Sequence, residues 1–371
     1  MINPNYIYSF IFLAVFGIYQ LEWSDLYPAL RLPLLLFLIF TISANFMMGS
    51  FLKRTILKIK RVPEKSSSEQ GIVLATLILS VIWTIDKSLG NIPTVHIILI
   101  TFTSFYNCFV FSKFLNEKKA IQLIVFIVLF LTIAFFSTYR ILIFFNLVTC
   151  FLTYIYLKNP FKSTKGKLVI LVLTIGLFYI FGVLGNTIKE GHDTGKVILV
   201  IGEATEEFKN SIIPDEFFWI YLYSSSPLAN LQLNIKFQHS IEPTLHGYWL
   251  WMVSEFLPDF ISKTIFASIN EKQLDGIQVN PALNVSTVYM RSFRYASWFG
   301  LTFMAFFVMI FPIIYLYIIR NSKYFITGLV SLSTIYLFLI FDNIFAFSAL
   351  SFQLVYPLFG IWKIKLKSTD E

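Results

Sequence analysis

The chain has 371 residues, of which 57% are hydrophobic, 18% are aromatic and only 13% are charged, with a net charge of +8. Soluble domains carry about 25% charged residues, so this composition excludes an ordinary soluble protein. The apolar residues form blocks of roughly 15 to 20, long enough to cross a hydrocarbon core of about 30 Å as helices. The composition predicts an all-α, polytopic membrane protein with a single integral membrane domain over residues 1–371.

The N-terminal stretch MINPNYIYSF lacks the basic region and the small-residue cleavage site of a secretory signal, so the first apolar run is expected to be a retained span. Ten apolar runs occur in chain order, at about 6–21, 32–52, 71–85, 94–112, 120–137, 140–157, 168–186, 298–319, 324–341 and 343–362. A long segment, 187–297, separates the last three runs from the others. We expect about ten spans and one large extracytoplasmic loop over 187–297.

Basic residues are distributed unevenly among the segments that join these runs. Alternate segments hold 18 of the 29 basic residues, namely 53–70, 113–119, 158–167, 320–323 and 363–371. The short links on the opposite side hold only Arg31, Lys87 and Arg140. Because cytoplasmic loops of membrane proteins are enriched in Lys and Arg, both termini are predicted to be cytoplasmic and 187–297 to lie outside.

Two aromatic stretches stand out in the long outer segment. EFFWIYLY (216–223) is too short to span a membrane. YWLWMVSEFLPDFISKTIF (248–266) is long enough, but it contains Glu255, Pro258 and Asp259, and charges are costly in hydrocarbon. Both stretches are expected to form helices at the membrane interface, and the number of spans would rise to twelve if both inserted.

Arg140, Arg291 and Arg294 lie at the predicted outer boundary of spans. The last two are three residues apart, so on a helix they share a face. Guanidinium groups bind phosphate through two parallel hydrogen bonds and stay charged at any pH. These arginines therefore predict an anion site at the depth of lipid headgroups. The alternative is that each one anchors the chain by extending to lipid phosphates.

The segment HSIEPTLHGYW places His239, Glu242 and His246 at positions that an unbroken helix would align. Pro243 interrupts that helix, and neither HExxH nor CxxC occurs, so no metal site is expected. His246 or a nearby carboxylate such as Glu255 remains a candidate acid or base. GHDTGKV (191–197) is too short for a phosphate-binding loop and has Val where Ser or Thr should follow, so no nucleotide cofactor is expected.

Several stretches occur in an order known from one enzyme family. They are STYR (137–140), YLYSSSPLANLQ (221–232), FLP (256–258) and NVSTVYMRSFRYASWFGL (284–301). Together with the dominant outer loop, they resemble the O-antigen polymerases, the Wzy-type oligosaccharide repeat-unit polymerases. The chain departs from the family at one point, because Ser297 and Trp298 precede the aromatic-Gly pair where an acidic residue is common. The resemblance implies that any role of that carboxylate is absent or is supplied by Glu255 or Asp259.

The resemblance implies a metal-independent glycosyltransferase of a bacterial cytoplasmic membrane. Its donor and acceptor would be oligosaccharides linked to undecaprenyl diphosphate. Arg140, Arg291 and Arg294 would stabilise the leaving diphosphate, whereas His246 or Glu255 would orient or deprotonate the acceptor hydroxyl. The implied partners are these lipid-linked sugars, the lipid bilayer and a chain-length regulator protein, with no nucleic acid.

Three alternatives stay open at the level of sequence. An O-antigen ligase would share the architecture and the donor. A polyprenyl-phosphate-sugar glycosyltransferase would use paired acidic residues in the first outer loop, for which Glu22 and Asp25 are the candidates. A transporter of lipid-linked sugars would show repeated halves and ionisable residues at mid-membrane, whereas the mid-span polar residues here are neutral ones such as Asn45 and Asn107.

Overall fold

The computed structural model describes residues 2–55, 69–90, 93–136, 140–190, 197–237 and 244–361. These residues form helices and connecting loops without any β-strand. The helices are α1 (Pro4–Tyr19), α2 (Leu32–Thr55), α3 (Glu69–Ser88), α4 (Pro93–Glu117), α5 (Ala120–Phe136), α6 (Arg140–Lys158), α7 (Thr164–Glu190), α8 (Val197–Ile201), α9 (Glu206–Lys209), α10 (Glu216–Phe237), α11 (Leu245–Phe256), α12 (Asp259–Ser268), α13 (Met290–Ile318), α14 (Phe325–Phe338) and α15 (Ser348–Ser351). Short 3-10 turns are η1 (Pro160–Lys162), η2 (Ile319–Asn321), η3 (Phe352–Leu354) and η4 (Tyr356–Leu358).

The all-α architecture agrees with the prediction. By length and composition, five helical stretches could cross a membrane: Leu32–Thr55, Glu69–Ser88, Val95–Glu117, Ile141–Lys158 and Met290–Asn321. Four other apolar runs form shorter helices, over Pro4–Tyr19, Ala120–Phe135, Phe325–Phe338 and Ser348–Ile361. The abundance of long apolar helices is what a membrane protein requires, since a helix satisfies its own backbone hydrogen bonds in lipid.

The last apolar run, 343–362, becomes helical only from Ser348 onward. Residues 339–347 form a loop, and the shorter apolar helix Ser348–Ile361 then follows, in which α15, η3 and η4 alternate α-helical and 3-10 turns. The loop is held by backbone hydrogen bonds from Ser286 and Val288 to the carbonyls of Phe341 and Leu339. These long-range contacts take up backbone groups that a helix would have used.

The two aromatic stretches of the long segment also differ from expectation. The stretch 216–223 is only the beginning of α10, a 22-residue helix that packs against α1, α7 and α13. The stretch 248–266 divides at Leu257 and Pro258 into α11 and α12. Proline has no backbone N–H and favours the first turn of a helix, so a new helix begins directly after it.

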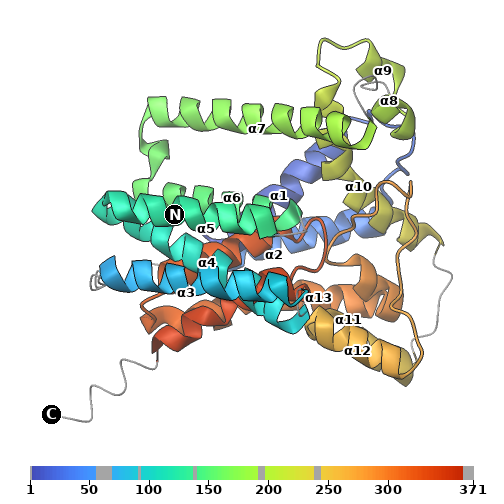
Figure 1. Ribbon diagram of the computed structural model, residues 1–371. Coiled ribbons are helices and arrows are strands. Elements are labelled where there is room, and N and C mark those ends of the chain that lie inside the picture. The colour runs from blue at the N-terminus through green and yellow to red at the C-terminus, as the bar shows by residue number, and fades with distance from the viewer. Residues whose placement is uncertain are drawn as a thin grey trace.

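The bundle has two distinct ends. At one end, Lys119 forms a 2.6 Å ion pair with Glu69, and Lys158 donates a hydrogen bond to the carbonyl of Leu115. These contacts bring the lysine-rich segments around 113–119 and 158–167 together. Figure 1 shows α8 and α9 at the upper right and α11 and α12 at the lower right, whereas the turn between α6 and α7 lies at the left. The basic segments 113–119 and 158–167 therefore lie at the end opposite to α11 and α12.

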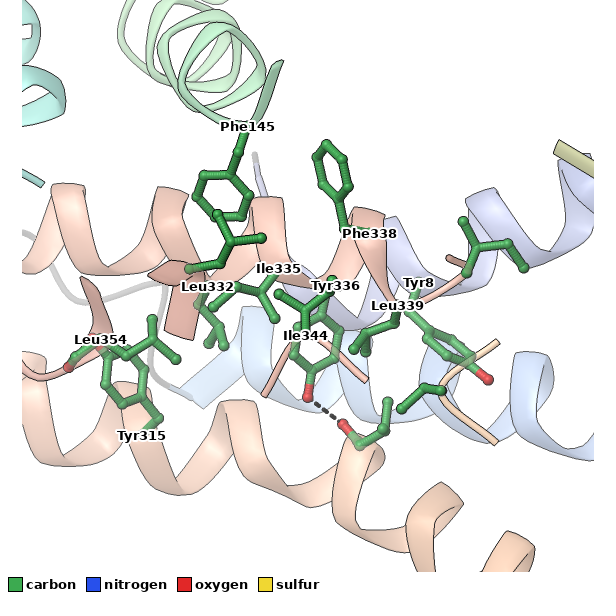
Figure 2. Close-up of a cluster of buried hydrophobic side chains, with 14 of the residues drawn as sticks. Tyr8, Phe145, Tyr315, Leu332, Ile335, Tyr336, Phe338, Leu339, Ile344 and Leu354 are labelled. Carbon is green, nitrogen blue, oxygen red and sulfur yellow. Dashed lines mark hydrogen bonds between the residues drawn. The ribbon is translucent and has the colours of Figure 1, made fainter. Parts of the chain in front are cut away.

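Aromatic and aliphatic side chains from four helices form the core that supports α13. Figure 2 shows Tyr8, Phe145, Tyr315 and Tyr336 among the side chains of this cluster. Pro312 lies inside α13 and leaves the Val308 carbonyl without its usual backbone donor. The Tyr336 hydroxyl of α14 donates to that carbonyl. The packing fixes α13 against α14 and thereby positions the N-terminal turns of α13.

Candidate functional site

The N-terminal turns of α13 contain Arg291 and Arg294. Non-helical backbone at Ala296 and Ser297, the latter with φ 51° and ψ −144°, separates these turns from the long apolar part of the helix. Gly300 makes the bend possible, because a Cβ at this position would lie 2.3 Å from the carbonyl oxygen of Ser292. The aromatic-Gly step in the sequence therefore marks a close backbone approach that aims the arginine turns away from the span.

Arg291 binds Asp342, a residue of the loop 339–347. Its Nη2 donates to both carboxylate oxygens, at 3.0 Å to Oδ1 and 2.8 Å to Oδ2. The backbone N–H of Asn343 donates to Oδ1 of the same carboxylate at 2.7 Å. The Arg291 side chain is 23% exposed and that of Asp342 is 50% exposed, so the pair lies at an accessible surface.

Glu255 of α11 provides a second carboxylate. Its Oε1 lies 4.0 Å from Nη1 of Arg291, and its side chain is completely buried. Ser254 donates a hydrogen bond to Oε1 at 3.1 Å, and Asn343 Nδ2 donates to Oε2 at 3.2 Å. Burial raises the pKa of Glu255 to about 7, although the nearby Arg291 guanidinium acts in the opposite direction. We call Glu255, Arg291 and Asp342 the arginine–carboxylate cluster.

Hydrogen bonds between α11 and α13 hold the cluster together. Trp251 Nε1 donates to Ser292 Oγ at 3.1 Å, and Ser292 Oγ lies 3.4 Å from Oε2 of Glu255. Asn343 Nδ2 also donates to the Glu255 backbone carbonyl at 2.8 Å. These hydrogen bonds thus connect the Glu255 carboxyl group and α11 to the loop 339–347.

Asp259 anchors the other side of the 339–347 loop. Its backbone N–H donates to the carbonyl of Ala346 at 2.8 Å, and its carboxylate accepts hydrogen bonds from the Ser348 hydroxyl and backbone N–H. The carboxylate is also paired with Lys263 at 3.0 Å. Asp259 therefore stabilises the 339–347 loop. Of the two acidic residues near FLP, Glu255 is the one that lies beside Arg291.

Asn230 and Asn234 of α10 hold the extended segment that leads to α13. Asn230 accepts from the N–H of Val279 at 2.8 Å and donates to the carbonyls of Leu283 and Val285. One turn later, Asn234 accepts from and donates to the backbone of Ile277. The two asparagine side chains satisfy backbone groups of the extended segment, which has no partner strand to do so. The SPLANLQ stretch therefore contributes to the site by holding the backbone that leads to α13.

The remaining predicted residues have different surroundings. His246 pairs with Glu271 at 2.7 Å and is 58% exposed, so its hydrogen-bonding partner lies outside the cluster. Arg294 is partly buried, one turn beyond Arg291. Arg140 begins α6, but its side chain lies outside the described residues. Its membership in the site stays a prediction.

Other sequence expectations also fall outside the described residues. They concern His239, Glu242, the GHDTGK portion (191–196) of 191–197 and the C-terminal basic segment 363–371. Within the ranges that are described, no group of three or more His, Cys, Asp or Glu could hold a metal ion. Glu22 and Asp25 are exposed on the loop between α1 and α2.

Asp342 and Asn343 are the functional candidates that sequence reasoning missed. They form the only polar pair in the apolar stretch LFLIFDNIFAF, and Asp342 is its only charged residue. An isolated acidic residue between two apolar runs is a recognisable signal, because charge at that depth is costly without a partner.

Comparison of the chain with protein-family models, with curated proteins and with solved structures finds no match. The chemistry must therefore be inferred from the site itself. The site offers a partly exposed guanidinium, a half-exposed carboxylate in contact with it, and a buried carboxyl group that titrates near neutral pH. Such a set can accept a proton from a nearby hydroxyl, and its guanidinium can donate hydrogen bonds to an anion.

Proposed function

We propose that this protein polymerises oligosaccharide repeat units linked to undecaprenyl diphosphate, at the outer face of a bacterial cytoplasmic membrane. The arginine–carboxylate cluster is the observation that supports this proposal most strongly. It combines a cation for a phosphate leaving group with carboxylates for a hydroxyl nucleophile, which are the groups that glycosyl transfer from a lipid diphosphate needs.

The surroundings of the cluster favour a lipid-linked substrate. Three apolar residues of α11 are exposed: Leu245 is 90% exposed, Trp249 45% and Met252 46%. Phe299, at the start of the apolar part of α13, is 56% exposed beside Tyr248. Trp and other aromatic side chains are enriched at membrane–water interfaces. A cluster beside such a helix would lie at the depth of lipid headgroups, where a diphosphate would be found.

The proposed orientation follows from the distribution of charge. The lysine-rich segments occupy the end of the bundle opposite to α11 and α12. By the positive-inside rule, that end faces the cytoplasm together with both termini, and the cluster faces outward. The substrates would then be donor and acceptor glycolipids in the outer leaflet, with a chain-length regulator protein as a further partner.

In the proposed reaction, a hydroxyl of the acceptor repeat unit attacks the anomeric carbon of the donor glycan. The bond from that carbon to the diphosphate oxygen breaks, and undecaprenyl diphosphate leaves with the electron pair. Negative charge grows on the departing diphosphate, so the cations of the first turns of α13, Arg291 and Arg294, would stabilise the transition state more than the ground state. The diphosphate linkage itself supplies the driving force.

Deletion of the gene tests the proposal. A polymerase mutant should show a surface-glycan ladder reduced to a single repeat unit, and complementation should restore the full ladder. Loss of polymer from the lipid A core with polymer still attached to undecaprenyl diphosphate would instead indicate a ligase. Accumulation of unpolymerised repeat units on the cytoplasmic side would indicate a transporter. An unchanged ladder would contradict all three functions.

A further inference from the structure

The two carboxylates of the cluster differ in their access to a substrate. The side chain of Glu255 is completely buried, and its oxygens accept hydrogen bonds from Ser254 and Asn343. The side chain of Asp342 is half exposed. A general base must come within hydrogen-bonding reach of the proton that it removes. In this arrangement Asp342 meets that requirement and Glu255 does not.

The carboxylate of Asp342 is also held in a defined orientation. Oδ1 accepts from Arg291 and from the backbone N–H of Asn343, whereas Oδ2 accepts from Arg291. An ionised carboxylate has about four lone-pair positions, so the group retains acceptor capacity for a hydroxyl. Asp342 is thus both oriented and accessible.

The loop that carries Asp342 is fixed on both sides. Ser286 donates a backbone hydrogen bond to the carbonyl of Phe341, and the N–H of Asp259 donates to the carbonyl of Ala346. Asn343 Nδ2 bonds to the backbone carbonyl of Glu255 at 2.8 Å. These attachments come from three different parts of the long segment. Such support is expected for a group that must be held within a fraction of an ångström of its working position.

We propose that Asp342 is the general base that activates the acceptor hydroxyl, an inference that rests on the proposed polymerase function. As the acceptor oxygen bonds to the anomeric carbon of the donor, its proton passes to a carboxylate oxygen of Asp342. The bond between the anomeric carbon and the diphosphate oxygen breaks, and the lipid diphosphate leaves with that electron pair. Asp342 then returns the proton to water or to the released diphosphate.

The proposal gives the other cluster members distinct tasks. Arg291 becomes a positioning residue for Asp342 as well as a source of positive charge, because its Nη2 contacts Asp342 while its Nη1 faces Glu255. Glu255 is a positioning residue that acts through Arg291 and Asn343. One guanidinium thus spans two carboxylates, which a lysine ammonium with its single nitrogen could not do in the same geometry.

The test uses the purified full-length protein and a fluorescent repeat unit on undecaprenyl diphosphate. Asp342→Asn should lower turnover at least a hundredfold, within the usual range for loss of a general base, while donor binding changes less than threefold. Asp342→Ala should regain part of its turnover in formate, which supplies a small carboxylate. Asp275→Asn is the matched control, because Asp275 influences Arg291 only by charge, and it should retain near-normal turnover.

Near-normal turnover by Asp342→Asn would overturn the assignment. So would a loss of donor binding equal to the loss of turnover, with no rescue of Asp342→Ala by formate, because that pattern indicates a structural role. Failure of the wild-type protein to join repeat units would remove the proposed function itself, and the assignment with it. The wild-type reaction therefore separates the two kinds of failure.

Discussion

Substitution of Glu255 by Gln should remove a pH-dependent part of the protein's stability. The pKa of Glu255 is raised from 4.5 to about 7 because the carboxyl is buried. The folded chain therefore holds this proton more tightly than the unfolded chain does. The resulting stabilisation is complete below about pH 4.5 and is lost as the pH rises through about 7. A pKa difference of this size corresponds to about 3 kcal/mol.

Thermal unfolding of wild-type protein and of Glu255→Gln in the same detergent, from pH 4.5 to pH 8, measures this effect. The apparent Tm of the wild type should fall by a few degrees relative to that of the variant as the pH rises. Asp275→Asn, which alters an exposed carboxylate, should follow the wild-type pH dependence. Parallel curves for wild type and Glu255→Gln would refute the reasoning, because Glu255 would then ionise no differently in the folded and unfolded chains.

Three further substitutions test the architecture of the site. Gly300→Ala should lower both the apparent Tm and the turnover, because the alanine Cβ would lie 2.3 Å from the Ser292 carbonyl oxygen and force the bend to open. A variant with wild-type Tm and wild-type turnover would contradict this expectation. Asn230→Ala should destabilise the chain by about 1–3 kcal/mol because buried backbone groups lose their partners, and it should increase proteolysis within 277–285, which limited digestion measures. Arg291→Lys should shorten the glycan ladder and slow turnover at least roughly tenfold, whereas a normal ladder at equal protein level would indicate a lipid anchor.

Much of the helical framework could be predicted from the sequence. Apolar runs at 32–52, 71–85 and 94–112 correspond to α2, α3 and α4, because long uninterrupted apolar stretches have few alternatives to a helix. The charge of Arg291 in the loop-to-span junction predicted an ionic site there, and in the structure this residue contacts Asp342. The functional importance of the junction stays a prediction.

The features that the sequence did not reveal depend on contacts between distant segments. The run 343–362 appears continuous in composition, but Ser286 and Val288 bind the backbone just before it and hold that backbone as a loop. Asn230 and Asn234 suggest a turn when considered alone, because asparagine side chains compete for backbone groups in helices. In the folded chain those side chains instead satisfy a segment more than forty residues away.

The partner of Arg291 could not be inferred by the same reasoning. Spacing along a helix predicted that Arg291 and Arg294 would share a face, and it said nothing about which residues stand opposite. Asp342 lies 51 residues further along the chain. No local sequence pattern could therefore predict the contact of Arg291 Nη2 with both carboxylate oxygens of Asp342. This contact changes the chemistry expected of Arg291.

The most direct test of the central claim is reconstitution of the purified protein in lipid nanodiscs with undecaprenyl-diphosphate-linked repeat units as the sole substrate. Chain growth and released undecaprenyl diphosphate are measured in the same samples. The proposed polymerase should form a ladder of products and release one undecaprenyl diphosphate for each glycosidic bond, without added nucleotide. Binding of the glycolipid with neither product nor release, under conditions where the protein remains folded, would contradict the account.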